Sequence, residues 1–401
     1  MISPRNTRSP LWWIIVTFGT FVGFLYWRNS LPSSVGSWAS SNGVTAANAT
    51  LGFGALYAVS GPGSPRRSKL EQAAAVTQIQ LTIPDLPAWT DEDVNGFKAD
   101  ENSTALTGSI KAWLSHHHVL KEFLASGVES AVIFEDDIDW DIRLRSQQAP
   151  LAQKAAQQLA ETMNLDTYEY PWGVPDRDWD LYYLGHCGDY FNDLADGIGI
   201  GHHHPSDLEG IPHVAYADSS MSLPTDLHPF TASMLVAFDV PPQTRILHKS
   251  QWPLCTFGYA ITRRAADRII NEIAPAKENA NTGVTAFDIA MLHGCRNGYL
   301  DKCYSLQPEL FHHMEGDSLI AEIDSADHKI FRPPVDARGL EQVIYRKETS
   351  NIDCGFFSGD FYYGSDASRL AFLQEEVGRK GRCLKPGKDA SIPPLAKPPR
   401  E

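Results

Sequence analysis

Hydrophobic and polar positions along the chain predict strands that alternate with helices. Short apolar runs predict buried strands over residues 55–59, 79–83, 131–134, 179–184, 257–261 and 304–306. Apolar residues at helical spacing predict helices over residues 66–76, 107–125, 146–164, 263–273 and 285–295. Strands separated by helices indicate a single α/β domain with a mostly parallel central sheet.

Two stretches lack this periodicity. Residues 189–254 are rich in Gly, His, Pro and Asp, and they are too long for a passive connection. We therefore expect an active-site or acceptor-binding loop there. Residues 385–401 are rich in Pro and Lys, a composition typical of a disordered tail.

The N-terminal region has a different pattern. Residues 11–27 carry no charge, follow Arg5 and Arg8, and have Trp or Tyr near both ends. As a helix they span about 25 Å, close to the thickness of an early-secretory bilayer. The basic residues before this span predict a cytoplasmic tail over residues 1–10 and a luminal body. A cleaved signal peptide is the alternative interpretation.

The region after this span predicts a stem and a luminal domain. Residues 28–50 are rich in Ser, Gly, Ala and Asn, which is typical of a flexible linker. Residues 51–384 would form the luminal domain. Asn48 and Asn102 each begin a glycosylation acceptor triplet, in agreement with a luminal location in the Golgi or endoplasmic reticulum.

The net charge of the chain argues against nucleic-acid binding. The 401 residues carry a formal net charge of −15, and the sequence shows no basic patch. A surface this acidic repels phosphate backbones, so we exclude nucleic acid as a partner.

The six cysteines all lie in the expected luminal part, where they form an even set. An oxidising lumen favours disulfides over a zinc site, since no Cys-x-x-Cys pair exists. By sequence distance the simplest pairs are Cys295–Cys303 and Cys354–Cys383, although other pairings remain open.

The strongest chemical signal is an acidic run at the end of the strand predicted over residues 131–134. Carboxylates crowded this closely repel one another unless water or a cation screens them. At a strand end they would face the crevice where α/β sheets bind ligands. Mn²⁺ or Mg²⁺ suits such oxygen ligands, and a solvated acidic turn is the alternative. The run comprises Glu135, Asp136, Asp137, Asp139 and Asp141.

This run resembles the Glu-Asp-Asp motif of glycosyltransferase family 25, which contains lipopolysaccharide and collagen galactosyltransferases. Further stretches resemble the family, its fungal members most, in the same order over roughly residues 51–318. They are residues 56–59 followed by Arg66 and Arg67, residues 114–116, residues 179–188, residues 255–266, Phe287-Asp288 and residues 307–311. In place of the family's usual Gly and Cys before the Ser-His pair, this chain has Lys111 and Ala112.

The resemblance implies a GT-A-like fold and an inverting transfer of a hexosyl group, such as galactosyl, from a UDP-sugar to a glycan or glycoprotein. It implies that Glu135 and Asp136 bind the donor and that Asp137 binds the metal. Asp139 repeats the Asp-x-Asp spacing with Asp137, so the ligand pair stays open.

Other site residues follow from the same blocks. His312 and His313 follow the 307–311 block, where related enzymes often supply a further metal ligand. His116 is expected to shape the donor site, and Arg66 and Arg67 to contact phosphate or uracil. Asp288 is the candidate base for the acceptor hydroxyl; a carboxylate that merely stabilises a helix N-terminus is the equal alternative.

Together these observations predict a type II membrane-anchored glycosyltransferase. Two other classes remain open: a metal-dependent hydrolase that uses the same acidic crevice, and a glycan-binding relative without turnover.

Overall fold

The computed structural model describes residues 44–163, 165, 170–191, 204–314 and 348–388. Internal contacts divide the chain into two units, Met1–Gly36 and Ser37–Glu401, and every described residue belongs to the second. The predicted anchor over residues 11–27 and most of the predicted tail lie outside the described residues. Within the described residues, no helix combines the length and apolar character needed to cross a membrane.

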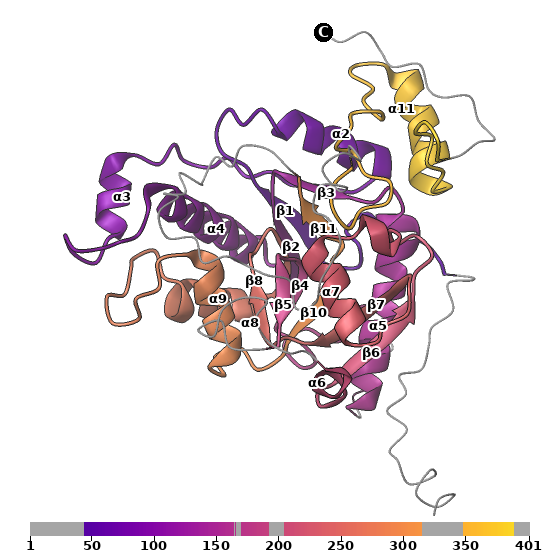
Figure 1. Cartoon of the computed structure of the whole chain (residues 1–401). Helices are drawn as coiled ribbons and strands as arrows, with labels where there is room; N and C mark the ends of the chain where they lie inside the picture. Colours follow the sequence, from indigo (N-terminus) through magenta and orange to yellow (C-terminus); the bar gives the residue numbers. More distant parts are fainter. Residues whose placement is uncertain (1–43, 164, 166–169, 192–203, 315–347, 389–401) are drawn as a thin grey trace, which may run out of the picture. The chain divides into compact units, whose positions relative to one another are not determined.

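A seven-stranded mixed sheet forms the centre of this unit (Figure 1). Its strands lie in the order β1 (Ala55–Val59), β2 (Ser130–Glu135), β9 (Gly258–Thr262), β4 (Leu181–Gly185), β10 (Cys303–Gln307), β7 (Thr244–Lys249) and β6 (His213–Ala217).

The α/β prediction is confirmed, but the expectation of a mostly parallel sheet is wrong. Of the neighbouring pairs in this sheet, only β1–β2 and β4–β10 are parallel. The pairs β2–β9, β9–β4, β10–β7 and β7–β6 are antiparallel. The physical reason is that β9 inserts between β2 and β4 in the opposite direction, and β7 reverses direction beside β10.

Side chains of β2 alternate between two cores, as a strand buried on both faces requires. Val132 and Phe134 pack in one core, whereas Ala131 and Ile133 pack in the other. Helices α2 (Arg67–Thr77) and α5 (Ala149–Thr162) contribute to the first core. Helices α4 (Thr107–Ser126), α8 (Arg263–Arg268) and α9 (Phe287–Arg296) contribute to the second, so the sheet lies between two helical layers (Figure 1).

Most helices and strands predicted from the sequence match the observed ones to within a few residues, but one predicted strand does not. The strand expected over residues 79–83 is reduced to a single bridge between Thr82 and Tyr57. There, Thr82 exchanges backbone hydrogen bonds with Leu56 and Ala58 of β1 at 2.9 Å each. Other short helical elements in these parts of the chain are α3 (Asp91–Phe97) and π-helical turns over Leu144–Gln148 and Ile269–Ile273.

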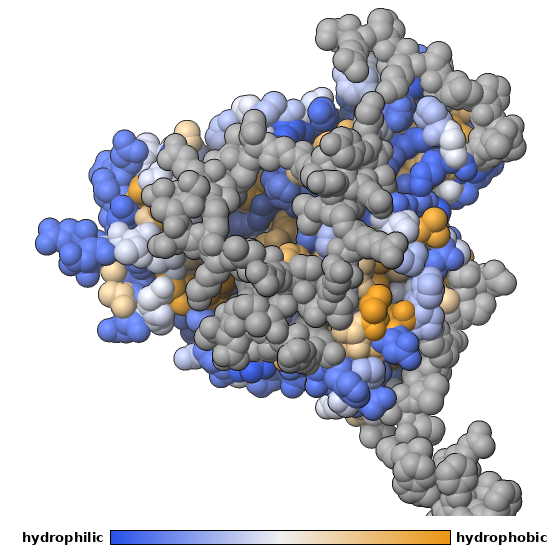
Figure 2. Space-filling view, in the orientation of Figure 1, coloured by the Kyte–Doolittle hydropathy of each residue, from blue (hydrophilic) through white to orange (hydrophobic). Residues whose placement is uncertain are grey.

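Residues 189–254 hold far more structure than the loop that we expected. They contribute β6 and β7 to the central sheet and most of β5 (Gly188–Tyr190). They also include β8 (Trp252–Leu254), α6 (Pro205–Glu209), α7 (Pro229–Ala237) and a 3₁₀ turn at Pro224–Asp226. The pattern concealed β7 because Arg245 and His248, which are polar, are fully buried in it. Helix α7 is apolar on several sides: Val236 is 67% exposed, and Figure 2 shows apolar side chains at the surface near this helix.

Three disulfides join the six cysteines in pairs: Cys187–Cys255, Cys295–Cys303 and Cys354–Cys383. The two pairs expected from sequence distance are therefore confirmed. The last pair closes the C-terminal segment, residues 348–388, which contains α11 (Ala367–Leu373) and a π-helical turn at Gln374–Arg379. This segment builds a small core of its own with Val76 and Ile142.

Candidate active site

A cavity of about 660 Å³ lies where several strands and helices end. Its polar lining includes five residues expected from the sequence: His116 from α4, Glu135 from the end of β2, Asp288 from α9, and the adjacent His312 and His313. Its apolar lining includes Tyr190, Phe230, Leu254, Phe257 and Phe287. A few polar groups in an apolar hollow are typical of a small-molecule site.

A second, two-stranded sheet places histidines beside the acidic run. After β2 the chain turns at Asp136 and Asp137 and continues as β3 (Ile138–Trp140). This strand pairs with β11 (Phe311–His313) in an antiparallel register that sets His313 opposite Ile138 and His312 opposite Asp139. The two regions that the resemblance connects are therefore neighbours in space.

Asp137 lies at the centre of the polar contacts. Its Oδ2 is 3.1 Å from His313 Nε2 and accepts a hydrogen bond from Arg66 at 3.2 Å. Burial would raise the pKa of Asp137, but the hydrogen bond from His313 and the charge of Arg66 hold that pKa below its usual value. The same hydrogen bond raises the pKa of His313. The other oxygen, Oδ1, is buried without a hydrogen-bond partner among the described residues.

Asp136 and Glu135 face different neighbours. Asp136 accepts a hydrogen bond of 2.7 Å from Ser60, just after β1, and lies 3.9 Å from Arg66. Glu135 lies 3.4 Å from His116 Nε2. The opposite nitrogen of His116 is 3.2 Å from the Tyr259 hydroxyl, and the imidazole stacks on Phe287.

Asp139 does not join this cluster. It is 1% exposed, and its carboxylate accepts hydrogen bonds from Phe356 N at 2.8 Å, Phe357 N at 3.1 Å and Thr349 Oγ1 at 2.8 Å. Burial raises the pKa of Asp139. A Cβ at Gly355 would clash with this carboxylate. In the structure, Asp139 therefore anchors the C-terminal segment.

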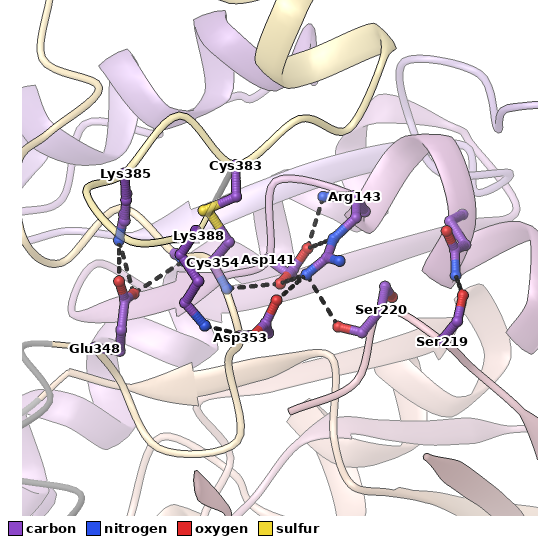
Figure 3. Close-up of polar contacts among 12 residues, drawn as sticks. Asp141, Arg143, Ser219, Ser220, Glu348, Asp353, Cys354, Cys383, Lys385 and Lys388 are labelled. Atoms are coloured by element: carbon purple, nitrogen blue, oxygen red, sulfur yellow. Dashed lines mark hydrogen bonds and ion pairs between the residues drawn. A yellow bond between two sulfur atoms is a disulfide. The ribbon is translucent and has the colours of Figure 1, made fainter. Parts of the chain in front are cut away.

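Asp141 has a similar anchoring role (Figure 3). Its two oxygens accept from Arg143 Nε and Nη2 at 2.7 and 2.8 Å, and Oδ2 also accepts from Cys354 N at 2.9 Å. The same guanidinium binds Asp353 at 2.7 Å. The acidic run thus divides into residues 135–137, at or beside the cavity, and Asp139 and Asp141, which hold the chain's C-terminal segment.

Asp288 occupies the first turn of α9 and lines the cavity. Its Oδ2 accepts from Cys255 N at 3.3 Å. Burial raises the pKa of Asp288, and the nearby charge of Glu135 raises it further. Both interpretations made from the sequence, a base and a helix N-terminal carboxylate, are compatible with this position.

His312 has a buried partner that the sequence did not indicate. Its Nδ1 contacts Oε1 of Glu309, and Glu309 is 2% exposed. Burial would raise the pKa of Glu309, but His312 lowers that pKa to about 2. His228, which also lines the cavity, has its pKa lowered to about 4 by burial.

Arg67, expected at the donor, lies elsewhere. It lines a separate hollow of about 480 Å³ with Glu71 and Asp85, and its guanidinium donates to Ile83 O at 3.5 Å. The structure therefore brings Arg66, but not Arg67, to the acidic run.

The sequence did not indicate Ser60, His228 or Glu309, nor Asn351, whose amide donates to Glu309 at 2.7 Å. Glu309 lay inside a matching block and could have been flagged there. No pattern distinguished the other residues from ordinary polar positions.

No group of three or more His, Cys, Asp and Glu side chains in the described parts of the chain has the arrangement of a complete metal site. No family model and no curated protein matches this chain.

Proposed function

We propose that this chain is an inverting glycosyltransferase that moves a hexosyl group, such as galactosyl, from a UDP-sugar to a hydroxyl of a glycan or glycoprotein, with Mn²⁺ or Mg²⁺. The mixed sheet would then be a GT-A-like variant. The observation that carries this proposal is Asp137, which is nine-tenths buried at the end of β2, with one carboxylate oxygen that no described residue hydrogen-bonds.

An unpaired buried oxygen costs about 1–3 kcal/mol unless a partner satisfies it. A divalent cation is a suitable partner, because Asp137 already lies beside a second metal-binding side chain, that of His313. Mg²⁺ usually binds through one or two carboxylates, with substrate phosphates and water completing its shell. The lack of a complete protein cage among the described residues is therefore compatible with a cation shared with a diphosphate.

The surrounding groups suit the donor. Arg66 and the Ser60 hydroxyl adjoin Asp136 and Asp137, where they can meet phosphate oxygens. When bound, the cation would neutralise the charge that grows on the leaving diphosphate. Glu135 and His116 lie on the cavity side of these residues, where the sugar would follow.

The acceptor would enter the same cavity near Asp288. A carboxylate with a raised pKa is a better proton acceptor near neutral pH than an ordinary one. Asp288 would take the proton of the attacking hydroxyl. Aromatic residues around it would exclude water and favour the acceptor over hydrolysis.

The three disulfides support an oxidising compartment. We therefore place the domain in the lumen of the Golgi or endoplasmic reticulum. Residues 11–27 would anchor it as a type II membrane protein.

The test uses the purified full-length chain with a panel of UDP- and GDP-sugars, each titrated with and without Mn²⁺. We expect one UDP-hexose to bind only with Mn²⁺ and to be transferred to a glycan acceptor. Release of free sugar or phosphate that does not decrease when a glycan acceptor is added would identify a hydrolase instead. Glycan binding without binding of any nucleotide sugar would identify a non-catalytic lectin and refute the proposal.

A further inference from the structure

The C-terminal segment reaches the cavity, although it lies beyond the residues that carry the family resemblance. Ser350 lines the cavity, and the neighbouring Asn351 is 1% exposed. Asn351 has a φ of +64°, in the left-handed region that Asn tolerates better than most residues. Its side chain contacts two separate parts of the chain, the start of α7 and Glu309.

Each half of the Asn351 amide has its own partners. Nδ2 donates to Glu309 Oε1 at 2.7 Å and to Thr231 Oγ1 at 3.0 Å. Oδ1 accepts from His228 N at 2.7 Å. A flipped amide would set an oxygen against the Glu309 carboxylate and an NH₂ group against a backbone N–H. The contacts therefore fix one orientation of this amide.

The backbone of Glu309 is also fixed by hydrogen bonds. Arg245 Nη1 donates to the backbone oxygens of Pro308 and Glu309 at 2.6 and 2.9 Å. Arg245 is itself buried and paired with Asp218 at 2.7 Å. Because His228 N fixes the orientation of the Asn351 amide, Nδ2 donates to Oε1 of Glu309, and this oxygen acts as a hydrogen-bond acceptor.

These contacts determine the tautomer and the orientation of the His312 imidazole. Its Nδ1 faces an oxygen that can only accept, so Nδ1 must carry the proton. The other nitrogen, Nε2, is then left for the cavity that His312 lines. Carboxylate–imidazole pairs of this kind fix the tautomer and orientation of metal-ligating histidines.

We propose that Asn351, acting through Glu309, is a positioning residue that fixes His312 with Nδ1–H on Glu309 and Nε2 directed into the cavity. The C-terminal segment is then part of the site, in addition to packing against α2. What Nε2 binds, a divalent cation with its diphosphate, rests on the proposed function; the orientation of the ring does not.

The first test reads the tautomer directly. The full-length chain, labelled with ¹⁵N-histidine, is examined by two-bond ¹H–¹⁵N correlation, and His312 is assigned by its loss in His312→Gln. We expect a single form with the proton on Nδ1. Asn351→Asp sets a second carboxylate against Glu309, and Glu309→Gln removes the ionised acceptor. Each should convert His312 to a mixture of tautomers.

Thr231→Val is the matched control, because it removes one acceptor of the Asn351 amide and leaves the Glu309 contact intact. Its His312 signal should match that of the unsubstituted chain. A proton on Nε2 in the unsubstituted chain would overturn the proposal. An unchanged tautomer in both Asn351→Asp and Glu309→Gln would also overturn it.

The second test measures Mn²⁺ binding in the presence of UDP by calorimetry. Asn351→Asp should weaken Mn²⁺ binding by roughly 10- to 100-fold, the effect typical of losing a partner of a ligating histidine. In a His312→Gln background the same substitution should have little effect, because its influence passes through His312. Full additivity would overturn the proposal. If the unsubstituted chain binds no Mn²⁺ while His312 keeps the expected tautomer, the proposed function fails and the positioning stands.

Discussion

Two aspartates in the acidic run, Asp137 and Asp139, offer the sharpest test of how the structure divides that run. By spacing alone either could ligate a metal. Among the described residues, one oxygen of Asp137 has no hydrogen-bond partner and the other contacts His313, whereas Asp139 uses both oxygens to hold the C-terminal segment. The two Asp→Asn substitutions should therefore have different effects.

The cost of Asp139→Asn follows from its contacts. Each oxygen accepts from a backbone N–H of the C-terminal segment: Oδ1 from Phe356 and Oδ2 from Phe357. An amide has only one oxygen, so one of these N–H groups would face an NH₂ group. A buried donor left unpaired costs about 1–3 kcal/mol. Because burial raises the pKa of Asp139, loss of its charge offsets part of this cost, and we expect about 2 kcal/mol of destabilisation.

Thermal unfolding of the full-length chain measures this loss. An unfolding entropy of roughly 2 cal/mol/K per residue converts it to a decrease in Tm of about 3 °C for a unit of this size. Mn²⁺ affinity should stay within about threefold of the unsubstituted chain, because no oxygen of Asp139 is free to bind a cation.

Asp137→Asn is the matched counterpart. It removes a carboxylate beside the expected cation, so Mn²⁺ affinity should fall by on the order of 100-fold or more. Its Tm should fall only slightly: the amide oxygen can keep the contacts of Oδ2 with His313 and Arg66, and the lowered pKa of Asp137 means that loss of its charge costs some stability. If Asp139→Asn abolished Mn²⁺ binding and left Tm unchanged, the division of the acidic run drawn from the structure would be wrong.

Two further predictions concern stability. Removing Cys354–Cys383 by a double Cys→Ala substitution should lower the free energy of unfolding by about 3.6 kcal/mol, against about 2.5 kcal/mol for Cys295–Cys303. Their separations of 29 and 8 residues release different loop entropies. Urea denaturation would measure both, and equal losses would contradict the estimate. His248 is buried with its pKa lowered to about 4. The unfolded chain binds its proton below about pH 6.5, so the fold loses stability as pH falls from about 6.5 to 4. The free energy of unfolding, measured by urea denaturation at pH 7 and at pH 4.5, should fall by about 2 kcal/mol less in His248→Gln than in the unsubstituted chain. An equal fall in both would show that His248 is charged in the fold.

The sequence by itself determined the α/β class, most helices and several core strands. These elements are predicted by the local periodicity of hydrophobic residues, which is visible in the sequence without knowledge of the tertiary structure. It also identified the acidic run at the end of β2, because an apolar strand that changes abruptly to carboxylates is visible in the sequence itself. Chain distance favoured the two disulfides of short separation among the possible pairings, and the structure has both.

Only the tertiary structure decided how the strands pair. A strand pattern carries no direction, so the insertion of β9 between β2 and β4 depends on packing across the whole sheet. The strands β6 and β7 were missed for a related reason. Arg245 and His248 are polar by sequence, and they are buried only because Asp218 and the chain around Gln307 satisfy them.

The acidic run shows the same limit at the scale of single residues. Asp137 and Asp139 are two positions apart, so a continuous strand would direct both to one side. In the structure Asp137 belongs to the turn before β3, and the alternation starts anew at Ile138. Asp139 then meets the backbone of residues 356–357, more than two hundred positions later in the chain. The sequence therefore established that carboxylates gather at the end of β2, and long-range contacts decided which of them anchors the C-terminal segment and which lies beside His313.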